Sequence, residues 1–250
     1  MVAIEDLVSR LKREGISLWL DEGSIRYRAP AGKLTPELKE ALRSLKLPIT
    51  AWLQQQAEEE GARIPALARQ ARPEAIPLSF AQERLWAHDK LLGRSTTYNV
   101  MLMVRLRGPL DISVLQRCLS DIVARHETLR TRIVSTDGKP SQVVDPPRPV
   151  DLRFIDLGSL PEGVREQRAS EESEAELSRV FDLEQGPLLR ALLLRLSRDE
   201  HVLLMPHHHV ISDAWSIGVM LSDLATLYSA YIQSKPSPLP DLPIQYADFA

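Results

Sequence analysis

The sequence is poor in cysteine and has no large excess of charge, and each shortage excludes a class of protein. Its 250 residues include a single cysteine, so an internal disulfide is excluded and a reducing compartment is favoured. The net charge of −3 provides no basic field to attract nucleic acid or an anionic membrane. No apolar run approaches the roughly 20 residues that span a bilayer. We therefore expect a cytoplasmic protein that binds neither nucleic acid nor membrane.

Two local features support this expectation. The N-terminal stretch "MVAIEDLVSRLKREG" carries acidic residues early and lacks an apolar segment followed by small residues, so it does not have the pattern of a secretory signal. The one cysteine, Cys118, lies in "LQRCLSDIVARH", where the apolar residues recur at helical spacing. A buried structural thiol is therefore favoured over a nucleophile.

Residues 1–57 are predicted to form a small unit with the order helix, hairpin, helix, helix. The apolar positions that predict the first helix are Ile4, Leu7, Val8 and Leu11, and Gly15 is well placed to end it. "ISLWL" and "SIRYR" alternate on either side of the turn residues "DEG", which predicts a hairpin. Thr35 and Pro36 are a good helix start, and a last helix is expected from Pro48 through "ITAWLQQQ".

Residues 58–75 have the charge, Gly, Pro and Ala content of a linker, without a sustained apolar stripe. From residue 76 to residue 250 helical and strand patterns alternate, which predicts an α/β (α+β) layered domain. The predicted helices contain "LSFAQERLWAHDKLL", "LDISVLQRCLSDIVARHETL", "EESEAELSRVF" and "WSIGVMLSDLATLYSAYIQ". Strands are expected at "NVMLMVRLRG", at the hairpin "TRIVSTDGKPSQVV" and on both sides of "SRDE".

The stretch with the most chemistry is "PHHHVISDAWS", residues 206–216. If a strand runs through it, His207 and His209 share one face and His208 points to the other. Three such side chains cannot converge on one metal ion, and no Cys or Glu lies nearby at ligand spacing, so we expect no metal. Two interpretations remain open from the residues alone. The histidines are satisfied core residues, or one is a general base whose tautomer is fixed by Asp213 in the next turn.

The stretches "SFAQERLW", "RHETLRTRI", "HHVISDAWS" and the final "YADFA" follow one another in this order along the chain. They resemble, respectively, "SxAQxRLW", "RHExLRTxF", the signature "HHxxxDG" and the start of "YxDFAxW", which are motifs of the condensation domains of nonribosomal peptide synthetases, relatives of chloramphenicol acetyltransferase. The resemblance covers residues 76–250. It implies the N-terminal lobe of such a domain, one acetyltransferase-like lobe, truncated before the second.

The resemblance assigns roles to residues of this sequence. It places the catalytic histidine at His209, which acts as base on the acceptor amine or positions it, and it makes His208 structural. It also makes Asp213 structural, with Arg130 as its expected ion-pair partner. Breaking this pair by Asp213→Ala would then disorder the site.

Two positions depart from the family pattern. Ala214 replaces the usual Gly, so a positive φ there would cost roughly 1 kcal/mol. His207 stands where Met is usual. Neither change removes a residue to which the family assigns catalysis.

The implied chemistry is acyl transfer. A thioester on the phosphopantetheine arm of an upstream carrier protein is attacked by the amine of a downstream aminoacyl carrier. No cofactor is expected on this chain, because the arms belong to its carrier-protein partners. One lobe alone is expected to be inactive, because half a tunnel cannot orient two arms.

The first 57 residues resemble the N-terminal docking domains first recognised in the tubulysin synthetase, through "GISLWLDEGSIRYRAP". The resemblance implies that an acidic C-terminal segment of an upstream subunit adds as a strand to the hairpin. Arg26 and Arg28, on the polar face of the second strand, and Trp19 are the candidate contacts. The alternative is that these arginines only keep an edge strand soluble. Such domains also pair as homodimers, and the sequence does not decide this.

Two rival functions remain open. The chain could belong to another acyltransferase of the same superfamily that acts on an alcohol or a small amine. It could also be a protein-interaction module in which the histidines are inert. The amino acids joined, the donor stereochemistry and the upstream subunit are not evident from the sequence.

Overall fold

The computed structural model describes residues 7–8, 11, 14–21, 24–30, 33, 35–63, 68–69 and 71–250. The chain divides into two compact units, residues 1–66 and 67–250. Among the described residues, no helix combines the length and the apolar composition needed to cross a bilayer.

The first unit contains the predicted hairpin and the two helices that follow it. Its elements are β1 (Ser17–Asp21), β2 (Ser24–Arg28), α2 (Pro36–Ser44) and α3 (Lys46–Arg63). β1 and β2 pair antiparallel. The Thr35 hydroxyl accepts a hydrogen bond from the Leu38 N–H at 3.3 Å, which confirms the predicted cap. α3 continues to Arg63, into the segment 58–75 that was predicted as a linker.

The predicted first helix falls largely outside the described residues, although Leu7, Val8 and Leu11 within it are helical. Leu11 packs with Ile16 and Leu38 in the small core of this unit. Gly15 has φ +76°, and the Ile16 N–H that follows it donates to the Leu11 carbonyl at 2.9 Å. This left-handed turn ends the helix as predicted, because glycine adopts a positive φ without steric cost.

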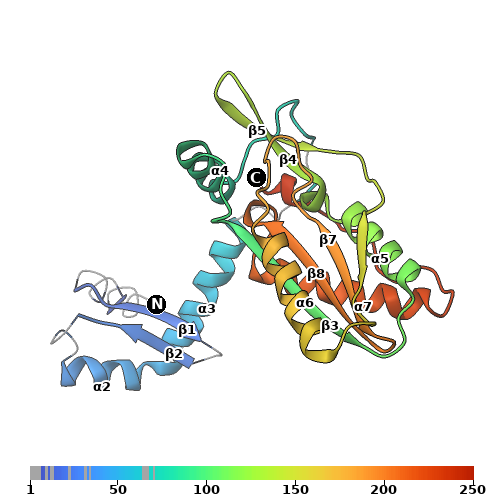
Figure 1. Ribbon diagram of the computed structural model, residues 1–250. Helices are drawn as coiled ribbons and strands as arrows, with labels where there is room; N and C mark the ends of the chain where they lie inside the picture. The colour runs from blue at the N-terminus through green and yellow to red at the C-terminus, as the bar shows by residue number, and fades with distance from the viewer. Residues whose placement is uncertain are drawn as a thin grey trace. The chain divides into compact units, whose positions relative to one another are not determined.

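The second unit is built on a four-stranded sheet with the order β3-β8-β7-β6 (Figure 1). β8 pairs antiparallel with both β3 and β7, and β6 pairs parallel with β7. Its elements are α4 (Phe80–Leu92), β3 (Asn99–Arg107), α5 (Ile112–Arg125), η1 (Glu127–Arg130), β4 (Thr131–Thr136), β5 (Lys139–Val144), β6 (Leu152–Asp156), α6 (Glu162–Leu177), β7 (Ala191–Ser197), β8 (Glu200–His208), η2 (His209–Ile211), α7 (Ala214–Tyr231) and η3 (Tyr246–Asp248).

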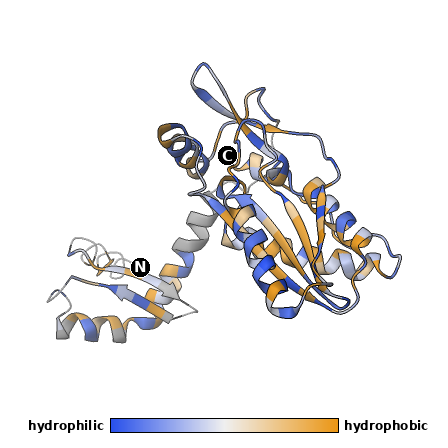
Figure 2. Cartoon of the chain, in the orientation of Figure 1, coloured by the Kyte–Doolittle hydropathy of each residue, from blue (hydrophilic) through white to orange (hydrophobic). Residues whose placement is uncertain are grey.

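Helices cover both faces of this sheet. On one face Leu193, Leu203 and Met205 share a buried cluster with residues of α5 and α7. On the other face Leu192 and Leu204 pack in a cluster that includes a residue of α6. Because β7 and β8 are buried on both faces, their sequences are almost continuously apolar rather than alternating (Figure 2). The α/β architecture predicted from the sequence is confirmed.

Three details of the second unit differ from the sequence prediction. The helix predicted over "EESEAELSRVF" is α6, which begins earlier, at Glu162, and ends at Leu177. The helix predicted over "LDISVLQRCLSDIVARHETL" ends at Arg125, and the next four residues form the 3-10 turn η1. β6 was not predicted, because "LRFID" is short and half-exposed and gives little periodic signal. Cys118 is fully buried, as expected for a structural thiol, and burial raises its pKa to about 11.

Candidate active site

The histidine motif lies where β8 ends and the chain turns toward α7. The strand ends at His208, and His209 begins the 3-10 turn η2. His207 and His208 are 1% and 3% exposed, whereas His209 is exposed. The prediction that His207 and His209 share a strand face is therefore wrong, because the chain leaves the strand one residue earlier than the alternation requires.

The His209 side chain is oriented by the backbone of its own turn. Its Nδ1 lies 2.6 Å from the carbonyl oxygen of Ser212. A carbonyl oxygen only accepts hydrogen bonds, so Nδ1 must carry the proton, and in the neutral ring Nε2 keeps its lone pair. The His209 N–H donates to the Tyr98 carbonyl at 2.9 Å, which ties the turn to the segment preceding β3. The result is an exposed imidazole whose free nitrogen can accept a proton.

Side chains from two distant motifs hold the same turn. The Gln82 amide, from "SFAQERLW", donates to the Val210 carbonyl at 3.4 Å. The Thr128 hydroxyl, from "RHETLRTRI", donates to the Ile211 carbonyl at 3.1 Å. Sequence reasoning did not single out either residue. The available signal was that both residues lie inside the quoted motifs. In the structure Gln82 is 2% exposed, and such a buried amide needs partners.

His208 is packed as an uncharged core residue. Its Nδ1 accepts a hydrogen bond from the Val210 N–H at 3.1 Å. The rings of Tyr98 and Phe181 meet it edge-on, with centroids at 6.2 and 6.5 Å. Burial lowers the pKa of His208 to about 4, with smaller contributions from the neighbouring histidines, so the ring is neutral at physiological pH. The neutral ring is what allows Nδ1 to accept.

Asp213 caps helix α7 and does not pair with Arg130. Its carboxylate accepts from the Ser216 N–H at 2.8 Å and from the Ser216 hydroxyl at 2.6 Å. These two bonds, the hydroxyl first, lower the pKa of Asp213. Arg130 instead donates to the Asp145 carbonyl and lies 3.6 Å from Glu127. The predicted ion pair is thus absent, because the cap position presents this carboxylate to its own helix.

Two further expectations concern this turn: the acceptor that orients the His209 ring and the backbone strain at Ala214. The acceptor that orients His209 is the Ser212 carbonyl rather than the predicted Asp213 carboxylate. Ala214 is the first residue of α7 and is not among the described residues with positive φ, so its Cβ causes no strain there.

The cap interaction gives a stability prediction. Asp213→Ala is expected to lower the free energy of unfolding by about 1 kcal/mol, because an orphan N–H of the first turn loses its acceptor. Asp213→Ser should retain most of the stability. The matched control is Asp111→Ala, which removes a similar cap from α5, where Asp111 accepts from the Ser113 and Val114 N–H groups. Chemical denaturation measures all three. A loss several times larger at Asp213 than at Asp111 would contradict the cap interpretation.

Two cavities lie elsewhere on this unit. One, of about 400 Å³, lies between the 104–110 segment and α7, and the other, of about 550 Å³, is lined by polar residues that include Arg125 and Arg130. Neither is lined by any residue of the histidine motif. Within the described part of the chain, no three His, Cys, Asp or Glu residues are grouped so that they could hold a metal ion.

The first unit presents its candidate contacts on one hairpin face. The register places Trp19 directly opposite Arg26, and Ser17 directly opposite Arg28. Directly opposed residues of an antiparallel pair lie on the same face. Trp19 is 42% exposed and both arginines are exposed. The aromatic ring and the two guanidinium groups therefore share one exposed face of the hairpin.

Comparison with known proteins identifies similar sequences for both units. Residues 73–250 match the Condensation domain family, and residues 4–55 match the TubC N-terminal docking domain. The chain is 45% identical over 177 residues to a chondramide synthase of Chondromyces crocatus. This match covers 71% of this chain and 4% of that protein. It is 40% identical over 198 residues to the malpinin synthetase of Mortierella alpina. That match covers 79% of this chain and 2% of that protein. The chain thus spans only a few per cent of these relatives.

Solved structures resemble the fold. The X-domain from teicoplanin biosynthesis is 31% identical, with a TM-score of 0.65 over 74% of this chain and 39% of that one. The first condensation domain of the calcium-dependent antibiotic synthetase, solved with a substrate analogue, is 28% identical, with a TM-score of 0.62. The match covers 67% of this chain and 40% of that one. A structure from the enacyloxin polyketide synthase, concerned with condensation domain-mediated chain release, is 29% identical, with a TM-score of 0.60. The match covers 99% of this chain and 47% of that one.

Proposed function

Because the chain belongs to the condensation-domain family, as its motifs predicted, we propose that residues 73–250 take part in peptide-bond formation in nonribosomal peptide synthesis. The substrates are an acyl thioester on the phosphopantetheine arm of an upstream carrier protein and the amine of a downstream aminoacyl carrier. The single observation that supports this most is the exposed His209 ring, whose Nδ1 is engaged by Ser212.

In this reaction His209 accepts one proton from the attacking amine and later donates it to the leaving group. As the amine nitrogen attacks the thioester carbon, its proton moves to Nε2 of His209, and a C–N bond forms. The C–S bond then breaks, and the departing pantetheine sulfur takes the proton back from Nε2. The carbonyl of Ser212 already accepts the Nδ1 proton of His209, and this hydrogen bond stabilises the ring while the ring is charged.

The pantetheine arms belong to the carrier proteins, and this chain needs no cofactor of its own. We place this chemistry in the cytoplasm, to which a single unpaired cysteine is suited.

We further propose that these 250 residues do not catalyse condensation alone. His209 is exposed, and neither cavity is lined by the motif. The chain also spans only 39–47% of the solved neighbours described above. Walls that hold two arms at reacting distance are worth several kcal/mol of the barrier.

The test is an assay with two loaded carrier proteins and detection of the peptide product by mass spectrometry. We expect product from a complete synthetase subunit that carries these residues and none from the 250 residues alone. Product formed by the short chain at a rate near that of the complete subunit would contradict the proposal.

For the first unit we propose docking to an acidic C-terminal segment of another synthetase subunit, which adds as a strand to the β1–β2 hairpin. Support comes from the match of residues 4–55 to a docking domain and from the face shared by Trp19, Arg26 and Arg28. Main-chain hydrogen bonds supply the affinity in this mode, and opposite charges select the partner.

This proposal predicts a charge-dependent affinity. In the full chain, Arg26→Glu with Arg28→Glu should weaken binding of an extended acidic peptide by about tenfold or more, because attraction becomes repulsion. Lys39→Glu with Lys46→Glu is the control, since it changes the net charge equally at two exposed positions on the helices. Isothermal titration measures each affinity. Equal binding by the wild type and the arginine variant would remove these residues from the interface, and dimerisation in place of peptide binding would favour the homodimer.

A further inference from the structure

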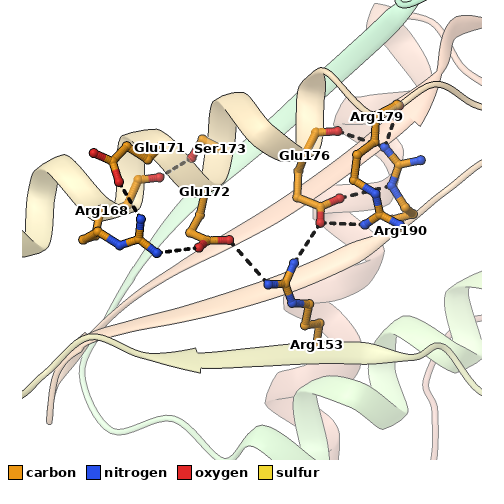
Figure 3. Close-up of polar contacts among 9 residues, drawn as sticks. Arg153, Arg168, Glu171, Glu172, Ser173, Glu176, Arg179 and Arg190 are labelled. Atoms are coloured by element: carbon orange, nitrogen blue, oxygen red, sulfur yellow. Dashed lines mark hydrogen bonds and ion pairs between the residues drawn. The ribbon is translucent and has the colours of Figure 1, made fainter.

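A buried carboxylate near the end of α6 gathers three arginines (Figure 3). The Glu176 Oε1 lies 2.7 Å from Arg179 and 3.1 Å from Arg153, and Oε2 lies 3.1 Å from Arg190. The Glu176 side chain is only 4% exposed. Burying a charge costs several kcal/mol even when it is paired, so packing alone does not account for a glutamate here.

Arg190 connects this cluster to the strand that carries the histidines. Its guanidinium also donates to the carbonyls of Glu176 and Arg179, at 2.9 and 3.0 Å. Its backbone N–H donates to the Pro206 carbonyl at 2.9 Å, and the His208 N–H donates to the Leu188 carbonyl at 3.0 Å. The side chain of Arg190 is thus fixed to α6, while its backbone is paired with the last residues of β8.

A second contact runs through an aromatic ring. The Arg190 guanidinium stacks over the ring of Phe181 at 3.8 Å. Phe181 is 2% exposed and meets the His208 ring edge-on. His208 in turn accepts from the Val210 N–H, inside the turn that begins with His209. Backbone and side-chain contacts from the Glu176 cluster therefore converge on the residue immediately before His209.

We propose that Glu176 is a positioning residue for the histidine motif: through Arg190 and Phe181 it holds His208 dry and in place, and so fixes the start of the His209 turn. The inference rests on the proposed function for its catalytic meaning, but the packing it describes can be tested without a substrate. Glu176 touches no reacting atom and acts only through these intermediates.

The experiment is an NMR titration of the ring nitrogens in the full chain labelled at its six histidines. In Glu176→Gln, Arg190 loses its ionic partner, and its looser stacking on Phe181 should let water reach His208, so that the His208 pKa rises from about 4 toward the ordinary 6.5. The control is Glu166→Gln, on the same helix, whose partner Arg105 is exposed. It should leave the His208 titration unchanged.

Each outcome decides the proposal. An unchanged His208 titration in folded Glu176→Gln would overturn it, even if that variant melts earlier. Should Glu176→Gln fail to fold, Phe181→Leu keeps the charged cluster and removes only the ring, and the same rise or its absence decides. Failure of the complete synthetase to condense its substrates would overturn the proposed function and leave this titration result standing.

Discussion

Replacing His209 with asparagine is expected to lower the condensation rate of the complete synthetase subunit by about 10²–10⁴-fold, the usual contribution of a general base. The asparagine amide can donate to the Ser212 carbonyl from nearly the position of Nδ1, so the turn should keep its shape. It has no group that can take the proton of the attacking amine. The rate is measured with loaded carrier proteins, and stability is measured by thermal unfolding.

Comparison with alanine separates the two roles open to His209. If the ring acts as a base, His209→Asn and His209→Ala should lose rate equally, and neither should lose much stability, because the side chain is exposed. If the ring only positions the amine by hydrogen bonding, asparagine should retain a large part of the rate that alanine loses. A wild-type rate in both variants would remove His209 from the mechanism.

Replacing Glu176 with alanine is expected to lower the free energy of unfolding of the second unit by about 3 kcal/mol. Three guanidinium groups lose their shared carboxylate, and the Arg190 side chain, 17% exposed, is left without an ionic partner. The expected loss is at the low end for a buried pair, because Arg153 and Arg179 are more than half exposed and regain water. Glu166→Ala, at an exposed pair on the same helix, should change stability by about 0–1 kcal/mol.

The Glu176 effect should depend on pH in a known direction. Burial alone raises the pKa of this carboxyl, but the hydrogen bond from Arg179 and the charges of Arg179 and Arg190 outweigh it, so the pKa lies below its ordinary 4.5. A group with a lowered folded pKa contributes stability above its unfolded pKa and loses it as the pH falls. The difference between wild type and Glu176→Ala should therefore be constant above about pH 5 and shrink below it. A difference that grows in acid would contradict this assignment.

The parts of the fold that the sequence predicts are those with a strong local signal. The β1–β2 hairpin follows from strict alternation, the Thr35 cap from its place before Pro36, and the strands β7 and β8 from a continuous apolar run around "SRDE". β6 escaped prediction because it is an edge strand whose pairing with β7 is set by tertiary contact and not by its own pattern. Local pattern also could not place the end of α3.

The site shows the same division. The motifs identify His209 and its neighbours, but strand alternation gave the wrong face for His209, since one turn of 3-10 helix changes every side-chain direction after it. The acceptor for its ring is a backbone carbonyl, which carries no residue-type signal. Arg130 and Asp213 have opposite charges, yet each interacts with a residue three positions away in its own segment, Arg130 with Glu127 and Asp213 with Ser216. The contacts of Gln82 with Val210, of Thr128 with Ile211 and of Glu176 with Arg190 join residues that are distant in the sequence, so no local pattern indicates them.

The most direct test of the account is which nitrogen of the His209 ring carries the proton when the ring is neutral. Nitrogen NMR of the histidine-labelled chain reports this from the chemical shifts of the two ring nitrogens. The account predicts a protonated Nδ1, held by the Ser212 carbonyl, and an unprotonated Nε2 open to solvent. A neutral His209 with its proton on Nε2 would contradict it, because the nitrogen left to accept a proton would then face the backbone.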